Sequence, residues 1–598
     1  MATMITLAEY LGRRLRQAGV GHLFGVPGDF NLTLLDHLTQ VPGLAWVGSP
    51  NELGAGYAAD AYARSRGLAV LVTTYGVGEL SALNAVAGSA AEDVPVVHIA
   101  GSPATTAVAA RRLVHHTLAD GVFDRFARAY AEVTVHQETL TADRPTEQID
   151  AVLSAALTHS RPAYLSIPSD LATLPVDPAP LAHPLPRAPR TSRPTTNAEG
   201  MIPSADGQPE GMIPSAGGQA EGMIPSVDGE PEGTIPSAGV ASGAEVAAFA
   251  AAIWRLVDGA ERPVIVAGHL VARFGLKDLL KSAQVPIVTT LAAKGVVDEG
   301  DPLYYGDYAG TMVDESTAEL VRDADLVLEL GTVATDVLSG FFTHRVVDDQ
   351  VVMVGATSAT IGTGDEHQVH FADAVRVLVD LLGGKRFRLP QREPAPASPA
   401  VAPERALTQE ALWATVQAWL PGGTAVLADT GTSFWGAVSL RFPADTVFVG
   451  QPIWNSIGYA LPAVLGQGLA DPGRRPVLFI GDGAAQMTMQ ELSTIAAAGL
   501  APIIVLLNNE GYTIERALQS PDAGYNDIAA WDWGALVGAL AGPKADYRRA
   551  HTAAELREAL DAAAEATETL SVVEVVLDRY DAPPLLRALA ARNSGGAE

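Results

Sequence analysis

The stretch GDGAAQMTMQELSTIAAAGLAPIIVLLNNEGYTIE, residues 481–515, decides the fold of this chain. The apolar run directly before it predicts a buried strand, the run 502–507 predicts a second strand, and a helical period begins around Met487. Asp482 follows the first strand and Asn509 follows the second, at the carboxyl ends where open α/β sheets bind ligands. One carboxylate and one amide oxygen should therefore meet at a common point, and such ligands suit Mg²⁺ that holds a phosphate.

Composition limits the possible partners. The chain has 598 residues and a formal net charge of −29, which argues against a nucleic-acid partner because phosphate backbones attract clustered lysine and arginine. It contains no cysteine, which excludes disulfides, thiolate metal ligands and a cysteine nucleophile. No run approaches the roughly 18 apolar residues of a membrane span, and Met1–Gly21 lacks an apolar signal core. We therefore expect a cytoplasmic protein with no membrane partner.

Three segments alternate between strand and helix patterns: 1–180, 243–385 and 405–598. This rhythm predicts an α/β protein with three successive open parallel-sheet domains, and the chain is also too long for a single core. The middle segment has no GxGxxG fingerprint, and its Gly268-His269 turn makes a poor nucleotide loop. A Pro- and Ala-rich linker at 386–404 should connect the second domain to the third.

The segment 181–242 breaks this rhythm with a composition rich in Pro, Gly, Ser and Glu. An 11-residue unit repeats within it as EGMIPSADGQP, EGMIPSAGGQA and EGMIPSVDGEP from Glu199 onward, followed by a partial copy that starts at Glu232. The unit is too short and too rich in Pro and Gly for a solenoid, so we interpret the segment as a disordered linker between the first two domains. A multivalent docking tract is the alternative interpretation.

A few polar residues in the first segment are candidates for chemistry. Asp29 follows Pro27-Gly28 in GVPGDFN, Glu52 begins a predicted helix, and His115 and His116 stand side by side in LVHHTLADGVF. Each also has an ordinary explanation. Acids are common in the first turn of helices, and paired histidines are more often surface or core residues than catalysts.

Several stretches together resemble one family of enzymes. GDG at 481–483, followed by Asn509 and Gly511, is similar to the diphosphate-binding motif of thiamine-diphosphate enzymes. NELGAGYAADAYAR, HHTLADG, ADTGTSFWGA, GQPIWNSIGYALPA and NNEGYTIERA resemble the decarboxylases of indolepyruvate, phenylpyruvate, branched-chain 2-oxo acids and pyruvate. The resemblance covers nearly the whole chain outside the repeats. It implies that the three domains are, in order, a pyrimidine-binding, a middle and a diphosphate-binding domain.

The resemblance implies a site for thiamine diphosphate and Mg²⁺. Asp482, Asn509 and the carbonyl of Gly511 would hold the metal, Ile457 would lie under the bend of the cofactor, and Glu52 would bind its pyrimidine ring. Removing CO₂ from a 2-oxo acid leaves a carbanion that no side chain can delocalise, so the reaction needs an electron-sink cofactor. The cofactor-binding candidates are Glu52, Thr430, Gly431, Ile457, Gly481, Asp482, Gly483, Ala484, Asn509, Gly511 and Tyr512.

The catalytic candidates are Glu52 and four residues that the resemblance places near the reacting carbon: Asp29, His115, His116 and Glu515. We expect Asp29 and His116 to relay protons while His115 orients them. Glu515 would face the substrate carboxylate, where charge repulsion and partial burial would favour its protonated form. The family also implies a homodimer, or a dimer of dimers, in which each active site takes its pyrimidine half from one subunit and its diphosphate half from the other.

The expected substrate is a small 2-oxo acid, and we favour a broad aromatic or branched-chain specificity. The candidate pocket residues are Phe434, Trp435, Ile514, Leu518 and Thr311. A strict pyruvate decarboxylase is one alternative, and a carboligase of the acetolactate synthase type, which usually needs a flavin, is another. A non-enzymatic binding protein is a third, but a scaffold has no physical need for all five catalytic candidates together.

Overall fold

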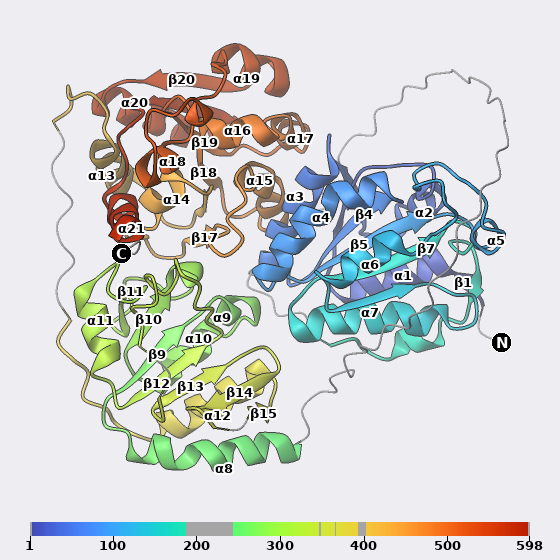
Figure 1. Ribbon diagram of the computed structural model, residues 1–598, viewed down its shortest axis with the longest axis horizontal. Coiled ribbons are helices and arrows are strands. Elements are labelled where there is room, and N and C mark those ends of the chain that lie inside the picture. The colour runs from blue at the N-terminus through green and yellow to red at the C-terminus, as the bar shows by residue number, and fades with distance from the viewer. Residues whose placement is uncertain (1–2, 187–242, 346–347, 365, 393–401, 596–598) are drawn as a thin grey trace.

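The computed structural model describes residues 3–186, 243–345, 348–364, 366–392 and 402–595. It contains three α/β domains in sequence order, shown in Figure 1 in blue to cyan, green to yellow, and orange to red. The predicted fold class is confirmed, while the predicted domain limits stay predictions. The repeats and their predicted disorder lie outside the described residues. In the described part of the chain, no helix combines the length and apolar character needed to cross a bilayer.

The first domain is built on a parallel sheet with the strand order β3-β2-β4-β5-β7-β6. Its central strands β4 and β5 are buried along their whole length, because helices cover both faces of such a sheet. The strands are β1 (Ile5–Thr6), β2 (His22–Gly25), β3 (Ala45–Gly48), β4 (Ala69–Thr74), β5 (Val96–Ser102), β6 (His136–Thr139), β7 (Ala163–Pro168) and β8 (Pro175–Val176). The helices are α1 (Leu7–Gln17), α2 (Leu32–Leu38), α3 (Glu52–Arg66), α4 (Val77–Ala91), α5 (Thr105–Ala109), α6 (Arg125–Ala131) and α7 (Pro145–His159).

The middle domain has the strand order β11-β10-β9-β12-β13-β14-β15, and only its last two pairings, β13 with β14 and β14 with β15, are antiparallel. This antiparallel edge is a feature that the parallel-sheet prediction did not include. The strands are β9 (Pro263–Ala267), β10 (Ile287–Thr290), β11 (Tyr304–Tyr308), β12 (Leu326–Leu330), β13 (Val351–Val354), β14 (Ser358–Ile361) and β15 (Glu366–Gln368). The helices are α8 (Gly243–Gly259), α9 (Leu270–Arg273), α10 (Lys277–Leu280), α11 (Glu315–Arg322) and α12 (Phe371–Gly383).

The third domain carries the stretch 481–515 on a parallel sheet with the order β17-β16-β18-β19-β21-β20. The strands are β16 (Ala425–Ala428), β17 (Val447–Val449), β18 (Pro476–Gly481), β19 (Ile503–Asn508), β20 (Asp546–Ala550) and β21 (Ser571–Val576). The helices are α13 (Gln409–Trp419), α14 (Thr432–Ala437), α15 (Ala460–Ala470), α16 (Asp482–Thr488), α17 (Glu491–Ala497), α18 (Thr513–Leu518), α19 (Trp533–Ala541), α20 (Ala553–Glu565) and α21 (Pro584–Gly595).

One predicted boundary in this domain is wrong. The helix expected to begin around Met487 begins at Asp482, directly after β18. The apolar period shows which residues face the core, whereas the start of a helix is set by the backbone. Here Gly481, with φ −73° and ψ 155°, is still extended, and the helical conformation begins at the next residue, Asp482.

The first and third domains pack through two helices rich in small residues, α3 and α15. A Cβ on Gly466 would lie 1.9 Å from the carbonyl oxygen of Ala58, so only glycine permits this close approach. Two buried hydrogen bonds cross the contact, from the Tyr459 hydroxyl to Asp60 at 2.6 Å and between Ser65 and Gln467 at 2.8 Å. The contact fixes α3, the helix that begins at Glu52, against the third domain of the same chain.

All three domains meet at Glu92 and Asp93, which follow α4. The Glu92 carboxylate accepts from the backbone N–H of Ile453 at 2.8 Å, and the Asp93 carboxylate lies 2.8 Å from Nε2 of buried His269. His269 thus joins the middle domain to the first. Its neighbour Gly268 is packed tightly, since a Cβ there would lie 1.9 Å from the carbonyl oxygen of Gly331.

Candidate active site

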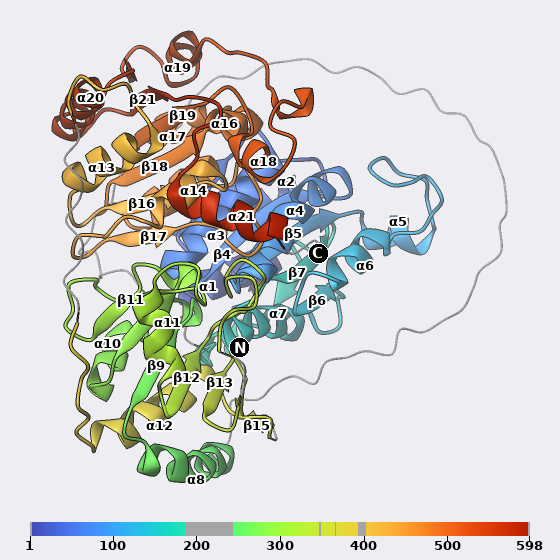
Figure 2. The ribbon, with the colours of Figure 1, turned by 60° about the vertical axis from the view of Figure 1, so that its left-hand side comes forward.

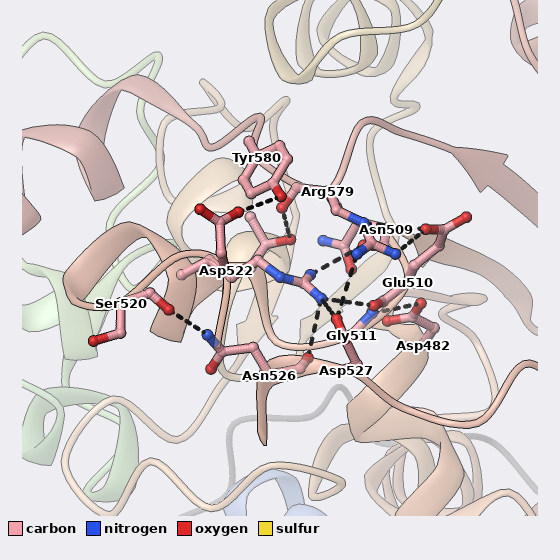
Figure 3. Close-up of polar contacts among 12 residues, drawn as sticks. Asp482, Asn509, Glu510, Gly511, Ser520, Asp522, Asn526, Asp527, Arg579 and Tyr580 are labelled. Carbon is pink, nitrogen blue, oxygen red and sulfur yellow. Dashed lines mark hydrogen bonds and ion pairs between the residues drawn. The ribbon is translucent and has the colours of Figure 1, made fainter. Parts of the chain in front are cut away.

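Two oxygen atoms, of Asp482 and Gly511, and one end of the Asn509 amide converge where β18 and β19 end. The Asn509 amide position that faces the site lies 3.1 Å from Asp482 Oδ1 and 2.9 Å from the carbonyl oxygen of Gly511 (Figure 3). Asp482 and Asn509 are each only 2% exposed. The structure therefore brings together the three residues predicted to hold a metal.

The orientation of the Asn509 amide decides what this cluster can bind. With its oxygen inward, three oxygens face one another and a cation is needed between them. With its nitrogen inward, the amide donates to Asp482 and Gly511, and its oxygen accepts from Thr513 Oγ1 at 3.0 Å. The Thr513 hydroxyl already donates to the carbonyl of Arg579 at 2.8 Å, which leaves its oxygen free to accept from an outward amide nitrogen.

The oxygen spacing fits Mg²⁺. Octahedral Mg²⁺ binds oxygen at about 2.1 Å, so neighbouring ligands lie about 3 Å apart, close to the two distances at Asn509. Burial raises the pKa of Asp482 to about 6, although backbone N–H groups, that of Gly483 first, lower it. A bound cation would lower this pKa, opposite to the effect of burial, because it favours the charged carboxylate.

The remaining cofactor candidates surround this point. The Tyr512 ring packs on Gly483, where a Cβ would lie 2.6 Å from a ring carbon. Gly431 has φ 122°, a conformation that favours glycine, and no atom lies within 4 Å of its Cβ position. Gly481 is equally open, while Ala484 is buried and Thr430 half-buried. The open glycines leave room for a ligand next to the metal position.

Ile457 is held by a buried acid that the sequence did not single out. Asp429 Oδ1 accepts from the N–H of Gly458 at 3.0 Å, and Oδ2 accepts from the N–H of Ala460 at 2.7 Å. Burial raises the pKa of Asp429 to about 7, while these N–H groups lower it. Asp429 thereby fixes the backbone directly after Ile457.

The first domain brings together three of its four catalytic candidates. His115 Nε2 lies 2.6 Å from Asp29 Oδ2, and His116 Nε2 lies 3.8 Å from Asp29 Oδ1. The Phe30 ring stacks on His115 with its centroid 4.9 Å away. The direct contact of Asp29 is thus with His115, the histidine expected only to orient the pair, rather than with His116.

The loop that carries His116 rests on a strained turn after β4. His116 has φ 59° and Gly76 has φ 64°, and a Cβ on Gly76 would lie 2.0 Å from the carbonyl oxygen of His116. The Tyr75 hydroxyl donates to the carbonyl of Phe123 at 2.6 Å on the other side of the loop. Gly76 itself donates its N–H to the buried Glu79 carboxylate at 2.6 Å.

Glu52 begins α3, as predicted, and is half-buried. The side chain of Asn51 caps the helix by accepting from the N–H of Leu53 at 2.8 Å. Glu52 Oε1 lies 3.3 Å from the Cβ position of Gly78, so the bare glycine makes room for the carboxylate at the end of β4. Glu52 therefore occupies the same carboxyl edge of the sheet as Asp29.

The position of Glu515 corrects one expectation. Within this chain its side chain is exposed, whereas the sequence analysis expected partial burial. α18 is short and presents Glu515 outward, while Arg516 beside it is buried.

The pocket candidates lie under the C-terminal helix. Phe434 and Trp435 are buried, Ile514 and Leu518 are half-buried, and all four share one apolar cluster with α21. Thr311 is exposed, but its carbonyl and hydroxyl oxygens both accept from Arg592 of α21 at 3.0 Å. Helix α21 packs on α14 and α18, which carry four of these candidates, and Figure 2 shows it beside α14.

Comparison with known proteins agrees with this geometry. The chain matches the N-terminal TPP binding domain of thiamine pyrophosphate enzymes over residues 5–127, their central domain over 250–382 and their C-terminal TPP binding domain over 429–575.

Full-length relatives carry one name. The chain is 40% identical to an alpha-keto-acid decarboxylase of Mycobacterium leprae over 98% of its own length and 95% of the relative. It is 40% identical to one of Mycolicibacterium paratuberculosis over 98% and 97%, and 39% identical to one of Mycobacterium tuberculosis over 98% and 96%. The chain therefore belongs to the thiamine pyrophosphate enzymes and, within them, to the family of the alpha-keto-acid decarboxylases.

Proposed function

We propose that this protein decarboxylates a 2-oxo acid to an aldehyde and CO₂ with thiamine diphosphate and Mg²⁺. The observation that carries this proposal is the Asp29–His115–His116 cluster at the carboxyl edge of the first-domain sheet. The reaction R–CO–COO⁻ + H⁺ → R–CHO + CO₂ consumes one proton, which must reach the carbon that loses CO₂. A carboxylate with one imidazole at 2.6 Å and a second at 3.8 Å offers three proton-carrying groups side by side for that delivery.

Residues of the third domain would hold the metal and the cofactor, and Glu52 of the first domain would bind the pyrimidine ring. Asp482, Asn509 and the Gly511 carbonyl would hold Mg²⁺, and Ile457 would support the cofactor from the Asp429-anchored turn. Bound thiamine diphosphate would supply the electron sink that stabilises the carbanion left by CO₂. Glu52 would hold a proton at the pyrimidine ring nitrogen.

Asp29 and His116 would move protons at the former carbonyl carbon, which loses CO₂, and at the product oxygen. His115, stacked on Phe30, would keep Asp29 in place. Glu515 would face the substrate carboxylate.

We infer that the working unit is a homodimer with shared sites, or a dimer of dimers. Large apolar side chains stand exposed near the first-domain half-site: Leu32 is 50%, Val77 51% and Leu80 44% exposed. Met487, beside the metal site, is 49% exposed. Such side chains close to two half-sites suit an interface that buries them.

We infer a preference for aromatic or branched-chain 2-oxo acids. The protein should be incubated with Mg²⁺, thiamine diphosphate and, separately, pyruvate, 2-oxoisovalerate, phenylpyruvate and indolepyruvate. Aldehyde should form, with kcat/KM highest for the branched or aromatic acids and lower for indolepyruvate, because bulky Phe434 limits the pocket. Glu52→Gln serves as the inactive control. A preference for pyruvate by orders of magnitude would overturn the specificity, and carboligation without aldehyde would overturn the reaction.

A further inference from the structure

Arg516 is a buried cation directly behind the metal site. It follows Glu515 in α18 and is only 4% exposed, whereas Glu515 is exposed. Neither the motif resemblance nor the proposed proton transfers use it. A guanidinium cannot be deprotonated in a protein, so its burial requires that its donors be matched by acceptors.

The acceptors come from two segments: residues 509–511, here called the metal loop because they contain two of the metal-binding candidates, and residues 526–527. Arg516 Nη2 donates to the carbonyl of Glu510 at 3.0 Å, to the carbonyl of Asn526 at 3.2 Å and to Asp527 Oδ1 at 2.7 Å. Nη1 reaches the carbonyl of Asn509 at 3.4 Å. Figure 3 shows the segments 509–511 and 526–527 facing each other across this contact.

The metal loop needs such a clamp because its backbone is strained. Glu510 lies between two metal-binding candidates and has φ 55°, and Gly511 has φ 128°. A Cβ on Gly511 would lie 2.2 Å from the carbonyl oxygen of Asn526, and Tyr512 donates its N–H to that same oxygen at 2.9 Å. The metal loop is therefore packed tightly against Asn526, and Arg516 hydrogen-bonds to the loop and to Asn526.

We propose that Arg516, with Asp527 as its counter-ion, is a positioning residue for the metal site. It fixes the backbone that aims the Asn509 amide and the Gly511 carbonyl, and it ties that backbone to the helix that presents Glu515. The inference rests on the proposed function for its choice of metal and cofactor. A change at Arg516 should therefore weaken metal binding before it disturbs the fold.

The guanidinium is suited to this task and an ammonium is not. Its planar fork offers five donors in fixed directions, enough for one carboxylate and several carbonyls at once. A lysine side chain would place one compact ammonium group there, with only three donors. Arg516→Lys should therefore retain part of the effect, and Arg516→Met should lose all of it.

The test measures metal affinity without turnover. Mn²⁺, which takes the same oxygen ligands as Mg²⁺, is titrated into cofactor-free protein with excess thiamine diphosphate, and free Mn²⁺ is followed by electron paramagnetic resonance. We expect the Kd for Mn²⁺ to rise at least tenfold in Arg516→Met and by a smaller factor in Arg516→Lys and Asp527→Asn. High Mg²⁺ should restore most of the lost aldehyde formation in Arg516→Lys.

Arg14 provides a matched control in the first domain. It is 1% exposed, binds both oxygens of Asp150, and donates to the carbonyls of Pro180 and His183 at 2.7 Å. Arg14→Met should lower thermal stability as much as Arg516→Met while leaving the Kd for Mn²⁺ unchanged.

Two results would overturn the proposal: a Kd within twofold of wild type in Arg516→Lys and Asp527→Asn, or an equal rise in Arg14→Met. Because binding is read without catalysis, a protein that binds Mn²⁺ but forms no aldehyde would refute only the proposed reaction.

Discussion

At the scale of single residues, Glu79 supports the His116 loop through the turn at Gly76. Its carboxylate accepts from the Gly76 N–H and from the Tyr164 hydroxyl, each at 2.6 Å, and the side chain is fully buried. Burial raises the pKa of Glu79 to about 7, although these two hydrogen bonds lower it. Glu79 is thus a structural acid that titrates in the range where the enzyme would work.

This pKa gives a pH dependence with a definite sign. Folded protein binds the Glu79 proton more tightly than the unfolded chain, so stability should fall as pH rises from about 4.5 to 7, by up to about 3 kcal/mol. Glu79→Gln removes this slope because the amide does not ionise. Chemical unfolding at pH 5 and pH 8 should show the variant gaining on wild type at the higher pH. Glu558→Gln, at an exposed position, is the control. An equal change in the free energy of unfolding between pH 5 and pH 8 in Glu79→Gln and in wild type would refute the assignment.

Residue types and spacing predicted that residues 482, 509 and 511 would lie together, but not which residues hold them in place. Asp482 and Asn509 follow predicted strands, so their convergence could be expected from the sheet alone. Asp429, Glu79 and Arg516 act through backbone N–H and carbonyl groups, and every residue has these groups. No sequence pattern can mark such partners, because only tertiary folding brings them within reach.

At the scale of elements, the turn after β4 and the His116 loop form one unit. Gly76→Ala would place a methyl group 2.0 Å from the carbonyl oxygen of His116, and neither backbone can yield cheaply. We expect kcat to fall at least tenfold because His116 moves, together with a stability loss of about 1–3 kcal/mol from the left-handed backbone.

Gly423→Ala separates these two effects. Gly423 also has a positive φ, 74°, but its Cβ position has no atom within 4 Å. This variant should lose stability without losing kcat, as measured by thermal unfolding and aldehyde formation. Equal kcat values in both variants would show that the loop does not depend on the turn.

Elements were predictable where one force dominates. The buried strands follow from continuous apolar runs, and the start of α3 follows from its Asn51 cap. The early start of α16 and the antiparallel pairing of β14 were not predicted. The spacing of apolar residues does not specify where the backbone becomes helical, nor in which direction a strand at the edge of a sheet pairs. The exposure of Glu515 was missed because sequence does not specify what covers a short helix.

At the scale of the whole molecule, the proposed shared sites predict complementation between two inactive proteins. Glu52→Gln alone removes the pyrimidine-side acid, and Asp482→Asn alone removes the metal carboxylate. A mixed dimer would keep one intact site, with Glu52 from one chain and Asp482 from the other. Random subunit exchange should restore about a quarter of wild-type aldehyde formation, because half of the dimers are mixed and each has one working site.

Co-expression of the two variants with different affinity tags provides the test. Tandem purification isolates the mixed dimer, which should reach about half of wild-type kcat per dimer. A mixed dimer as inactive as its parents would show that both halves of a site come from a single chain.

The amide of Asn509 can turn about a single side-chain bond, and this bears on how the protein would gain and lose its metal. A half-turn exchanges an inward oxygen for a nitrogen that bridges Asp482 and Gly511. The loop can thus satisfy its own polar groups without a cation, while Arg516 keeps the backbone in place. We therefore expect an empty subunit to take up its metal again by one side-chain rotation, without refolding.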